Sequence, residues 1–126
     1  MKTKILVVDD EADLELLIKQ KFRRKIREST YEFIFANNGQ EALERITENP
    51  DTDVILSDIN MPGMSGLDLL GRVKEEFEMP PTTMVMITAY GDDESYNKAM
   101  QLGANDFLTK PVDFGILKDK LLHLLR

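Results

Sequence analysis

The stretch Lys4-Ile5-Leu6-Val7-Val8-Asp9-Asp10-Glu11 is a short apolar run that stops abruptly at three acidic residues. A run of Val, Ile and Leu with little polar alternation is typical of a strand buried on both faces, as in a parallel sheet. Four similar runs follow, at residues 31–36, 54–57, 84–87 and 106–108. Together they predict five buried strands, and the first of them ends in a cluster of acids.

Segments with helical periodicity separate the strands. Apolar side chains recur every three or four positions within residues 14–26, 42–46, 67–77, 96–100 and 117–125, which places one face of each helix against a sheet. Asn38 and Ser65 precede the second and third segments, where a side-chain oxygen can cap free backbone N–H groups. Crossovers long enough for a helix imply parallel strands and right-handed connections. We therefore predict one doubly wound α/β domain over residues 1–126, with five strands and five helices.

The composition excludes several classes of protein. The 126 residues include no cysteine and a single histidine, His123, which excludes disulfide scaffolds and Cys-type zinc sites and argues against a His-based catalytic triad. No apolar run approaches the roughly 20 residues of a membrane span, and the start lacks the features of a signal peptide. The net charge of −7 argues against nucleic-acid binding. We expect a cytoplasmic protein that binds neither membranes nor nucleic acid directly.

Polar side chains suited to phosphate chemistry follow four of the five predicted strands: Asp9 and Asp10, Asp58, Thr88, and Lys110. Ligands of open α/β sheets bind outside the carboxyl ends of the strands, so we expect these groups to converge. Three neighbouring carboxylates require either a strongly raised pKa or a cation. Oxygen ligands without His or Cys favour Mg²⁺, with Mn²⁺ as the alternative. A carboxylate, a metal, an ammonium and a hydroxyl suit a phosphoryl group, which predicts an aspartyl phosphate on Asp58.

Three stretches that carry these residues resemble the signature segments of the response-regulator receiver family of two-component signalling, chemotaxis regulators included. They are residues 5–11, 56–66 and 103–111, and the resemblance extends over essentially the whole chain. It implies a flavodoxin-like sheet of order 2-1-3-4-5 with the site at its switch point. It also implies a phosphorelay in which a sensor histidine kinase or a histidine phosphotransfer protein supplies the phosphoryl group. The domain would then be a signalling domain that assists its own phosphorylation and dephosphorylation, not an enzyme.

The resemblance implies a role for each matching residue. Asp10 and Asp58 would ligate Mg²⁺ by side chain, Asp9 mainly through water, and Asn60 through its backbone carbonyl. Lys110 would pair with the phosphoryl group, or with Asp58 before phosphorylation. The Lys110–Pro111 peptide bond is expected to be cis.

Signal transmission is also implied by the resemblance. Thr88 would bond a phosphoryl oxygen and move toward it, and Phe107 would turn inward as the switch aromatic. The surface that responds would comprise the fourth helix, fifth strand and fifth helix, within residues 91–126, and would control a partner or an attached effector or form a homodimer. Asn60 and Tyr90 would tune the lifetime of the aspartyl phosphate. Phe107 departs from the tyrosine often found there and has no hydroxyl to bond.

Three other functions remain as alternatives. A phosphatase of the haloacid-dehalogenase type would carry its Asp-x-Asp motif on the first strand, whereas Asp58-Ile59-Asn60 follows the third and lacks the second carboxylate. A flavodoxin-like binding module would need a phosphate loop where this chain has Asp9 and Asp10. A receiver-like fold that acts only as an interaction module is the third.

Two surface features allow further interpretations. The first helical segment contains Lys19, Lys21, Arg23, Arg24, Lys25 and Arg27. These cations form either a solvated face, favoured near the C-terminus of a helix, or a docking surface for an acidic partner. Near the end of the chain, Leu121, Leu122, Leu124 and Leu125 would let the last helix continue into a coiled coil or a dimer contact.

Overall fold

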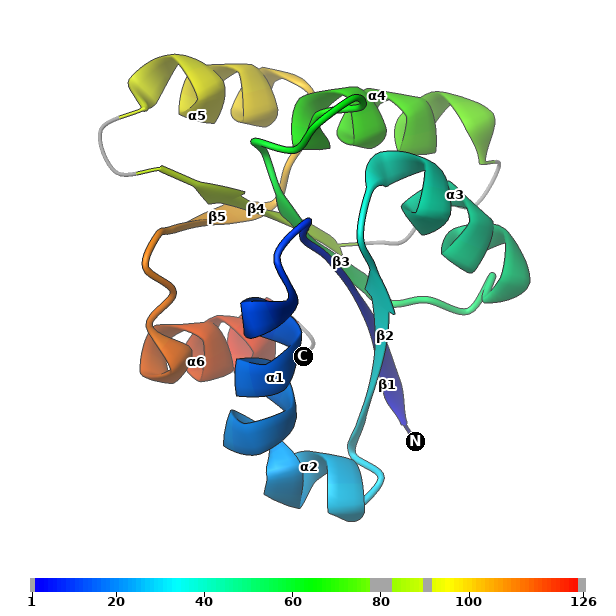
Figure 1. The fold of residues 1–126 in the computed structure, drawn as a ribbon, viewed down its shortest axis with the longest axis vertical. Helices are drawn as coiled ribbons and strands as arrows, with labels where there is room; N and C mark the ends of the chain where they lie inside the picture. Colours follow the sequence, from blue (N-terminus) through cyan, green and yellow to red (C-terminus); the bar gives the residue numbers. More distant parts are fainter. Residues whose placement is uncertain (1, 78–82, 90–91, 125–126) are drawn as a thin grey trace.

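The computed structural model describes residues 2–77, 83–89 and 92–124. Strands and helices alternate along these residues (Figure 1). The strands are β1 (Thr3–Val8), β2 (Tyr31–Ala36), β3 (Val54–Asp58), β4 (Thr83–Thr88) and β5 (Asp106–Thr109). The helices are α1 (Ala12–Lys21), α2 (Arg23–Arg27), α3 (Gly39–Glu48), α4 (Gly66–Glu76), α5 (Asp93–Gln101) and α6 (Phe114–Leu124).

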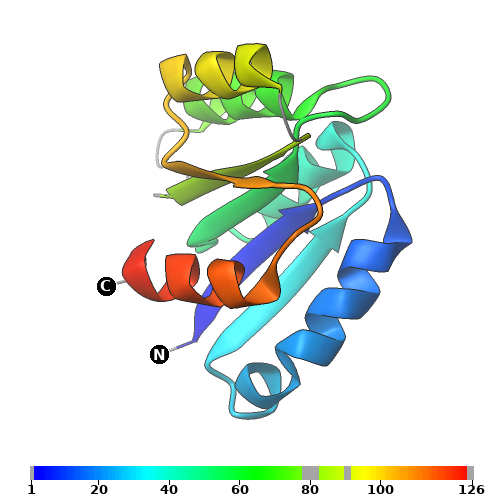
Figure 2. The same ribbon diagram turned by 90° about the vertical axis from the view of Figure 1, so that its left-hand side faces the viewer.

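All five strands lie in one parallel sheet, in the order β2-β1-β3-β4-β5. Helices α1 and α6 cover one face of this sheet, α3, α4 and α5 cover the other, and the short helix α2 lies beside the start of β2 (Figures 1 and 2). The doubly wound fold and the predicted order are therefore confirmed. The order reverses at β1, between β2 and β3, so the carboxyl ends of β1 and β3 flank the switch point.

The sheet divides the apolar core into two clusters. Alternate residues of a strand point to opposite faces, so in β3 Ile55 packs toward α3, α4 and α5, whereas Val54 and Leu56 pack toward α1 and α6. Every residue of β3 and β4 is buried. This burial explains why both strands read as continuous apolar runs without polar alternation.

Local side-chain chemistry sets the beginnings of two helices, as the sequence predicts. The Asn38 side chain accepts a hydrogen bond from the N–H of Glu41 at 2.8 Å and caps α3. Ser65 and Asp68 form a reciprocal capping box at the start of α4, with distances of 3.1 and 3.2 Å. These caps fix where the chain leaves the loops and enters the helices.

The prediction of five helices is wrong, because the first segment breaks into α1 and α2 within the described residues. Phe22 stands between them with φ −104° and ψ 17°, outside the helical region. Its buried ring packs against Tyr31 and Phe33, with ring centroids 6.0 and 5.2 Å away. Beyond the break, Ile26 is 37% exposed, although its spacing predicted contact with the sheet.

Candidate functional site

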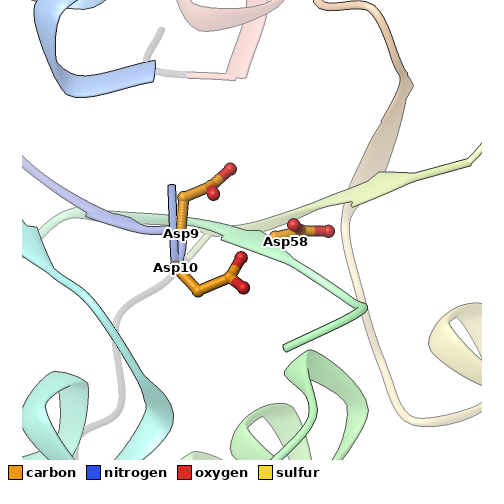
Figure 3. Close-up of side chains that lie close together, drawn as sticks. All are labelled: Asp9, Asp10 and Asp58. Atoms are coloured by element: carbon orange, nitrogen blue, oxygen red, sulfur yellow. The ribbon is translucent and has the colours of Figure 1, made fainter. Parts of the chain in front are cut away.

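Three carboxylates gather where β1 and β3 end (Figure 3). Asp58 is the last residue of β3, and Asp9 and Asp10 directly follow β1. Because Val8 pairs with Ser57 in the parallel register, the next residues, Asp9 and Asp58, come side by side. Carboxylate oxygens of Asp9, Asp10 and Asp58 all lie within 4.8 Å of one another. Asp9 and Asp58 are buried and Asp10 is exposed, so the cluster opens to solvent on the side of Asp10.

Lys110 supplies positive charge to this cluster. Its ammonium lies 2.7 Å from Asp58 Oδ2 and 3.9 Å from Asp9 Oδ2. Its backbone N–H donates to the carbonyl oxygen of Thr88 at 2.8 Å, which anchors the residue to the end of β4. The Lys110–Pro111 peptide bond is cis, as predicted.

Burial and the charges of the site shift the pKa of two of its titratable groups. Burial raises the pKa of Asp9, and the charges of Asp58 and Asp10 raise it further. The Glu11 N–H, 2.8 Å from Asp9 Oδ1, and the Lys110 ammonium oppose this rise without cancelling it. Burial lowers the pKa of Lys110, but the hydrogen bond to Asp58 and the charges of Asp58, Asp9 and Glu11 outweigh burial, so the pKa is raised.

This donor set fits a hard divalent cation. Three carboxylates face one ammonium, so the cluster has an excess of negative charge, and all its donors are oxygens. Burial and like charge together make the ionised form of Asp9 costly. A divalent cation among these oxygens would relieve that cost, and Mg²⁺ is bound in proteins by such carboxylate sets.

The structure brings two further predicted residues to the same edge. Thr88 is buried at the end of β4, the strand beside β3, where Asp58 pairs with Ile87. Asn60 is exposed, and its backbone N–H donates to Asp58 Oδ1 at 3.2 Å. Asp58 therefore receives hydrogen bonds on both carboxylate oxygens, from Asn60 and Lys110. Tyr90 lies outside the described residues.

Phe107 lies apart from the carboxylates, on β5, and is half-buried. Its ring meets that of Tyr96 on α5 edge-on, with centroids 4.5 Å apart and planes inclined by 72°. The Lys120 ammonium from α6 lies 5.7 Å from the Phe107 centroid and 2.9 Å from Asp106 Oδ2. Phe107 thus links α5, β5 and α6 through direct contacts.

A cavity of about 470 Å³ connects this aromatic pair with the site, since Thr88, Ala89, Tyr96 and Phe107 all line it. Thr88 therefore lies next to open space rather than in a filled core.

Sequence reasoning missed contributions that depend on backbone proximity or on tertiary contacts. The Glu11 N–H holds Asp9, and Gly66 lets α4 approach Asp58 closely. A Cβ built on Gly66 would lie 2.2 Å from the carbonyl oxygen of Asp58. Tyr96 and Lys120 were also missed as partners of Phe107. Of these features, only the close approach of α4 had a signal in the sequence, which is Gly66 directly after the capping residue Ser65.

Within residues 2–77, 83–89 and 92–124, none of the helices combines the length and the apolar character that a membrane crossing requires.

Comparisons with known proteins agree with this geometry. The family model of the response regulator receiver domain matches residues 5–122. Chemotaxis protein CheY1 of Helicobacter pylori is 36% identical over 118 residues, which cover 94% of this chain and 93% of that protein.

Two solved structures are similar over nearly the whole chain. A response regulator receiver domain protein from Clostridium thermocellum is 31% identical, with a TM-score of 0.83 over 97% of this chain and 93% of that one. The receiver domain of Ssk1 from Saccharomyces cerevisiae, solved with the histidine phosphotransfer protein Ypd1, gives a TM-score of 0.82 at 26% identity, over 98% and 88%. With the family match, the parallel sheet and the acid cluster at its switch point, the chain belongs to the response-regulator receiver family of two-component signalling.

Proposed function

We propose that residues 1–126 form a single receiver domain that accepts a phosphoryl group on Asp58 in a Mg²⁺-dependent reaction. The donor is a sensor histidine kinase or a histidine phosphotransfer protein of the cytoplasm. The observation that carries this proposal is the convergence of Asp9, Asp10 and Asp58 within 4.8 Å, with the Lys110 ammonium 2.7 Å from Asp58. A carboxylate held between Lys110 and the Asn60 N–H is positioned as a nucleophile, and Asp10 leaves the cluster open to an incoming donor.

Each residue of the site has a separate role in the proposed phosphoryl transfer. An Asp58 oxygen attacks phosphorus, an O–P bond forms, and the P–N bond of the donor breaks with its electron pair left on the imidazole nitrogen. The Lys110 ammonium and the Thr88 hydroxyl donate hydrogen bonds to phosphoryl oxygens, where negative charge gathers. Asp10 and Asp58 would hold Mg²⁺ directly, with Asp9 through water and Asn60 through its carbonyl. The bound ion would offset the repulsion between carboxylates and phosphoryl group.

After transfer, water hydrolyses the aspartyl phosphate, and we propose that Asn60 and Tyr90 tune its lifetime. Asn60 is exposed beside Asp58, so its side chain can affect the access of water. The domain thereby assists both its phosphorylation and its dephosphorylation, and its output is a change of surface rather than a released product.

The donor is expected to dock beside the carboxyl edge of the sheet. Helices α1 and α6 both begin at this edge and lie on the same face (Figure 2). Leu16 on α1 is 64% exposed and Ile116 on α6 is 50% exposed, so apolar contact area is available there. The complex of the Ssk1 receiver domain with Ypd1 supports a phosphotransfer protein as the kind of partner.

The output surface is proposed to be α5, β5 and α6, which correspond to the fourth helix, fifth strand and fifth helix predicted from the sequence. Phosphorylation adds about −1.5 to −2 charges, which attract the Thr88 hydroxyl and the Lys110 ammonium. Movement of Thr88 changes the cavity that it shares with Phe107, and Phe107 turns inward away from Tyr96. The changed surface controls a partner or an attached effector, or forms a homodimer. In α6, Leu121 is buried in the core, whereas Leu122 is exposed and available for such contact; Leu125 lies outside the described residues.

The central test is incubation with Mg²⁺ and acetyl phosphate, followed by intact-mass measurement beside Asp58→Asn. We expect a phosphate-sized mass gain that requires Mg²⁺ and is absent from the variant. A folded protein that gains no mass would overturn the proposal in favour of an interaction module. Turnover of small phosphoesters would favour the phosphatase alternative, and flavin binding would favour the flavodoxin alternative.

The switch is tested separately, by nuclear Overhauser contacts between the rings of Phe107 and Tyr96. Phosphorylation should abolish these contacts in the wild type. In Thr88→Ala, the mass gain should be slower but still occur, because Asp58, Lys110 and the acid cluster remain, and the ring contacts should persist after phosphorylation. Loss of the contacts in both proteins would exclude Thr88 as the link.

A further inference from the structure

A groove at the free edge of the sheet is lined by residues of β2, α1 and α2. Figure 2 shows these three elements side by side. Its floor is aromatic, formed by Tyr31, Phe33 and Phe35 of β2, and its helical wall carries Lys19, Arg23 and Arg27. Glu32 also lines the groove, and its carboxylate pairs with the Lys2 ammonium at 3.5 Å. The volume of the groove is about 480 Å³. The Lys19 ammonium lies 5.3 Å from the Phe35 ring centroid, so cationic and aromatic groups meet within the groove itself.

The charge of this region is opposite to that of the rest of the protein. Residues 19–27 contain six Lys and Arg and no acid, whereas the whole chain has a net charge of −7. The residues outside 19–27 therefore carry a net charge of −13. Arg23 and Arg27 have no carboxylate within 4.0 Å in the described part of the chain, while Lys19 has only Glu15, at 3.8 Å. The helix dipole favours the cations in the last turns of α1 and α2, but Arg23, the first residue of α2, lies outside both turns.

The backbone of β2 offers hydrogen-bonding groups along the same groove. The N–H groups of Thr3 and Asp9 on the β1 side donate to the carbonyls of Thr30 and Ala36, at 2.9 and 3.1 Å. The backbone N–H and C=O groups of the even-numbered residues of β2 therefore point toward β1. Because successive residues alternate, the N–H and C=O groups of residues 31, 33 and 35 face away from β1. In the sheet of described residues β2 is the terminal strand, so this side is an edge.

We propose that this groove binds an extended acidic segment of a partner protein, which pairs with the free edge of β2 as a sixth strand. Main-chain bonds to residues 31, 33 and 35 would supply affinity, as in other cases of strand addition. Every second side chain of the segment would lie over Phe33 and Phe35 and place a carboxylate against Arg23, Arg27 or Lys19. The intervening side chains would face half-buried Ile34 and are expected to be apolar.

The observations favour this occupant over two others. A second copy that paired β2 with β2 about a two-fold axis would bring the same cations of both copies together, and they would repel. Duplex nucleic acid and anionic membranes extend well beyond the groove and would meet the net charge of −13 on the other residues, whereas a short acidic segment would lie within the groove. Cations can also discourage edge-to-edge aggregation. Here, however, they stand on the helices, and Glu32 is the one charged residue of β2 itself.

The test uses a fluorescein-labelled ten-residue peptide of alternating glutamate and valine, with an alternating lysine and valine peptide as its control. Anisotropy measures binding to the full chain and to two double variants of equal charge. Lys19→Glu/Arg23→Glu changes the groove, whereas Lys21→Glu/Arg24→Glu changes cations of the same helices that do not line it. We expect at least tenfold weaker binding of the acidic peptide to the groove variant and less than twofold change in the matched variant. Amide shifts in the wild type should be largest at residues 31–35.

Several outcomes would overturn the proposal. They are no binding of the acidic peptide, equal weakening in both variants, equal binding of the lysine peptide, and amide shifts elsewhere. Self-association that the groove variant abolishes, or tighter binding of duplex DNA or phosphatidylserine vesicles than of the peptide, would assign the groove to another occupant. The proposal is independent of phosphoryl transfer, because the Mg²⁺-dependent mass gain on Asp58 should persist in both variants. That persistence also verifies that they fold.

Discussion

The Lys110 ammonium lies 2.7 Å from Asp58 Oδ2, although β4 lies between β3, which ends at Asp58, and β5, which Lys110 directly follows. The Lys110 side chain reaches across the end of β4, and its own N–H is bonded to the Thr88 carbonyl. Asp58 is 2% exposed, so this ammonium offsets a charge that water reaches poorly. Asp58 is thus held by the Lys110 ammonium before any ligand binds.

Replacement of Lys110 by Met should lower the free energy of unfolding by about 1–3 kcal/mol in the absence of divalent ions. Stability is lost because the buried Asp58 carboxylate is left without its ammonium partner. The loss should be smaller than for a fully buried ion pair, because Lys110 is partly exposed. Urea unfolding of Lys110→Met, Asp58→Asn and the double variant measures the coupling. Strict additivity of the two single changes would contradict a direct interaction.

Mg²⁺ should stabilise the protein through the acid cluster. At a hundredfold excess over its dissociation constant, a bound ion adds about 2.7 kcal/mol to the unfolding free energy. Without Mg²⁺, Asp10→Asn should be more stable than the wild type, because one of three neighbouring carboxylates is gone. With Mg²⁺ the ranking should reverse. Asp13→Asn, an exposed control outside the cluster, should keep the full Mg²⁺-dependent gain in urea unfolding.

Asp9 should make stability depend on pH when divalent ions are absent. Burial, and then the charges of Asp58 and Asp10, raise its pKa above the ordinary 3.8. The folded state therefore holds the proton more tightly than the unfolded state, and Asp9 costs stability as the pH rises from 3.8 through the folded pKa. The unfolding free energy of Asp9→Asn, relative to the wild type, should increase over that window. Carboxyl carbon shifts in NMR report the Asp9 titration directly, and a midpoint at or below 3.8 would refute this prediction.

Two glycines of α4 should respond oppositely to alanine. A Cβ on Gly66 would lie 2.2 Å from the Asp58 carbonyl oxygen and 2.8 Å from Ile59 Cα, so Gly66→Ala should cost about 1–3 kcal/mol and disturb Asp58. A Cβ on Gly71 has no neighbour within 4 Å, so Gly71→Ala should add about 0.5–1 kcal/mol through helix propensity. Similar unfolding free energies for the two variants would show that α4 can move away from Asp58.

Much of the fold could be predicted from periodicity. The five apolar runs, the order of strands and helices, and the caps at Asn38 and Ser65 all agree with the structure. The break at Phe22 could not be predicted, because an apolar stripe indicates which face is buried but not where the helix axis turns. That turn depends on the packing of Phe22 against Tyr31 and Phe33, which lie on a strand whose position the stripe does not encode.

The candidate site shows a similar division. The convergence of Asp9, Asp10, Asp58 and Lys110 follows from their positions after parallel strands, and the structure brings them together. The Glu11 N–H bond to Asp9 and the close approach of Gly66 could not be predicted, because they depend on backbone positions rather than on residue type. The lining of the groove beside β2 likewise requires the position of α2, although its cations were visible in the sequence.

The division of the core by the sheet has a consequence for how such a sequence can diverge. The cluster beneath α3, α4 and α5 and the one beneath α1 and α6 share no buried side chain, since each strand residue belongs to one side only. Volume changes on one side therefore need compensation only there, and substitutions on opposite sides should be nearly additive. The two sides of the core can therefore accumulate substitutions at different rates. At the edge that holds Asp9, Asp58 and Lys110, substitutions on both sides of the sheet must preserve the same side-chain positions.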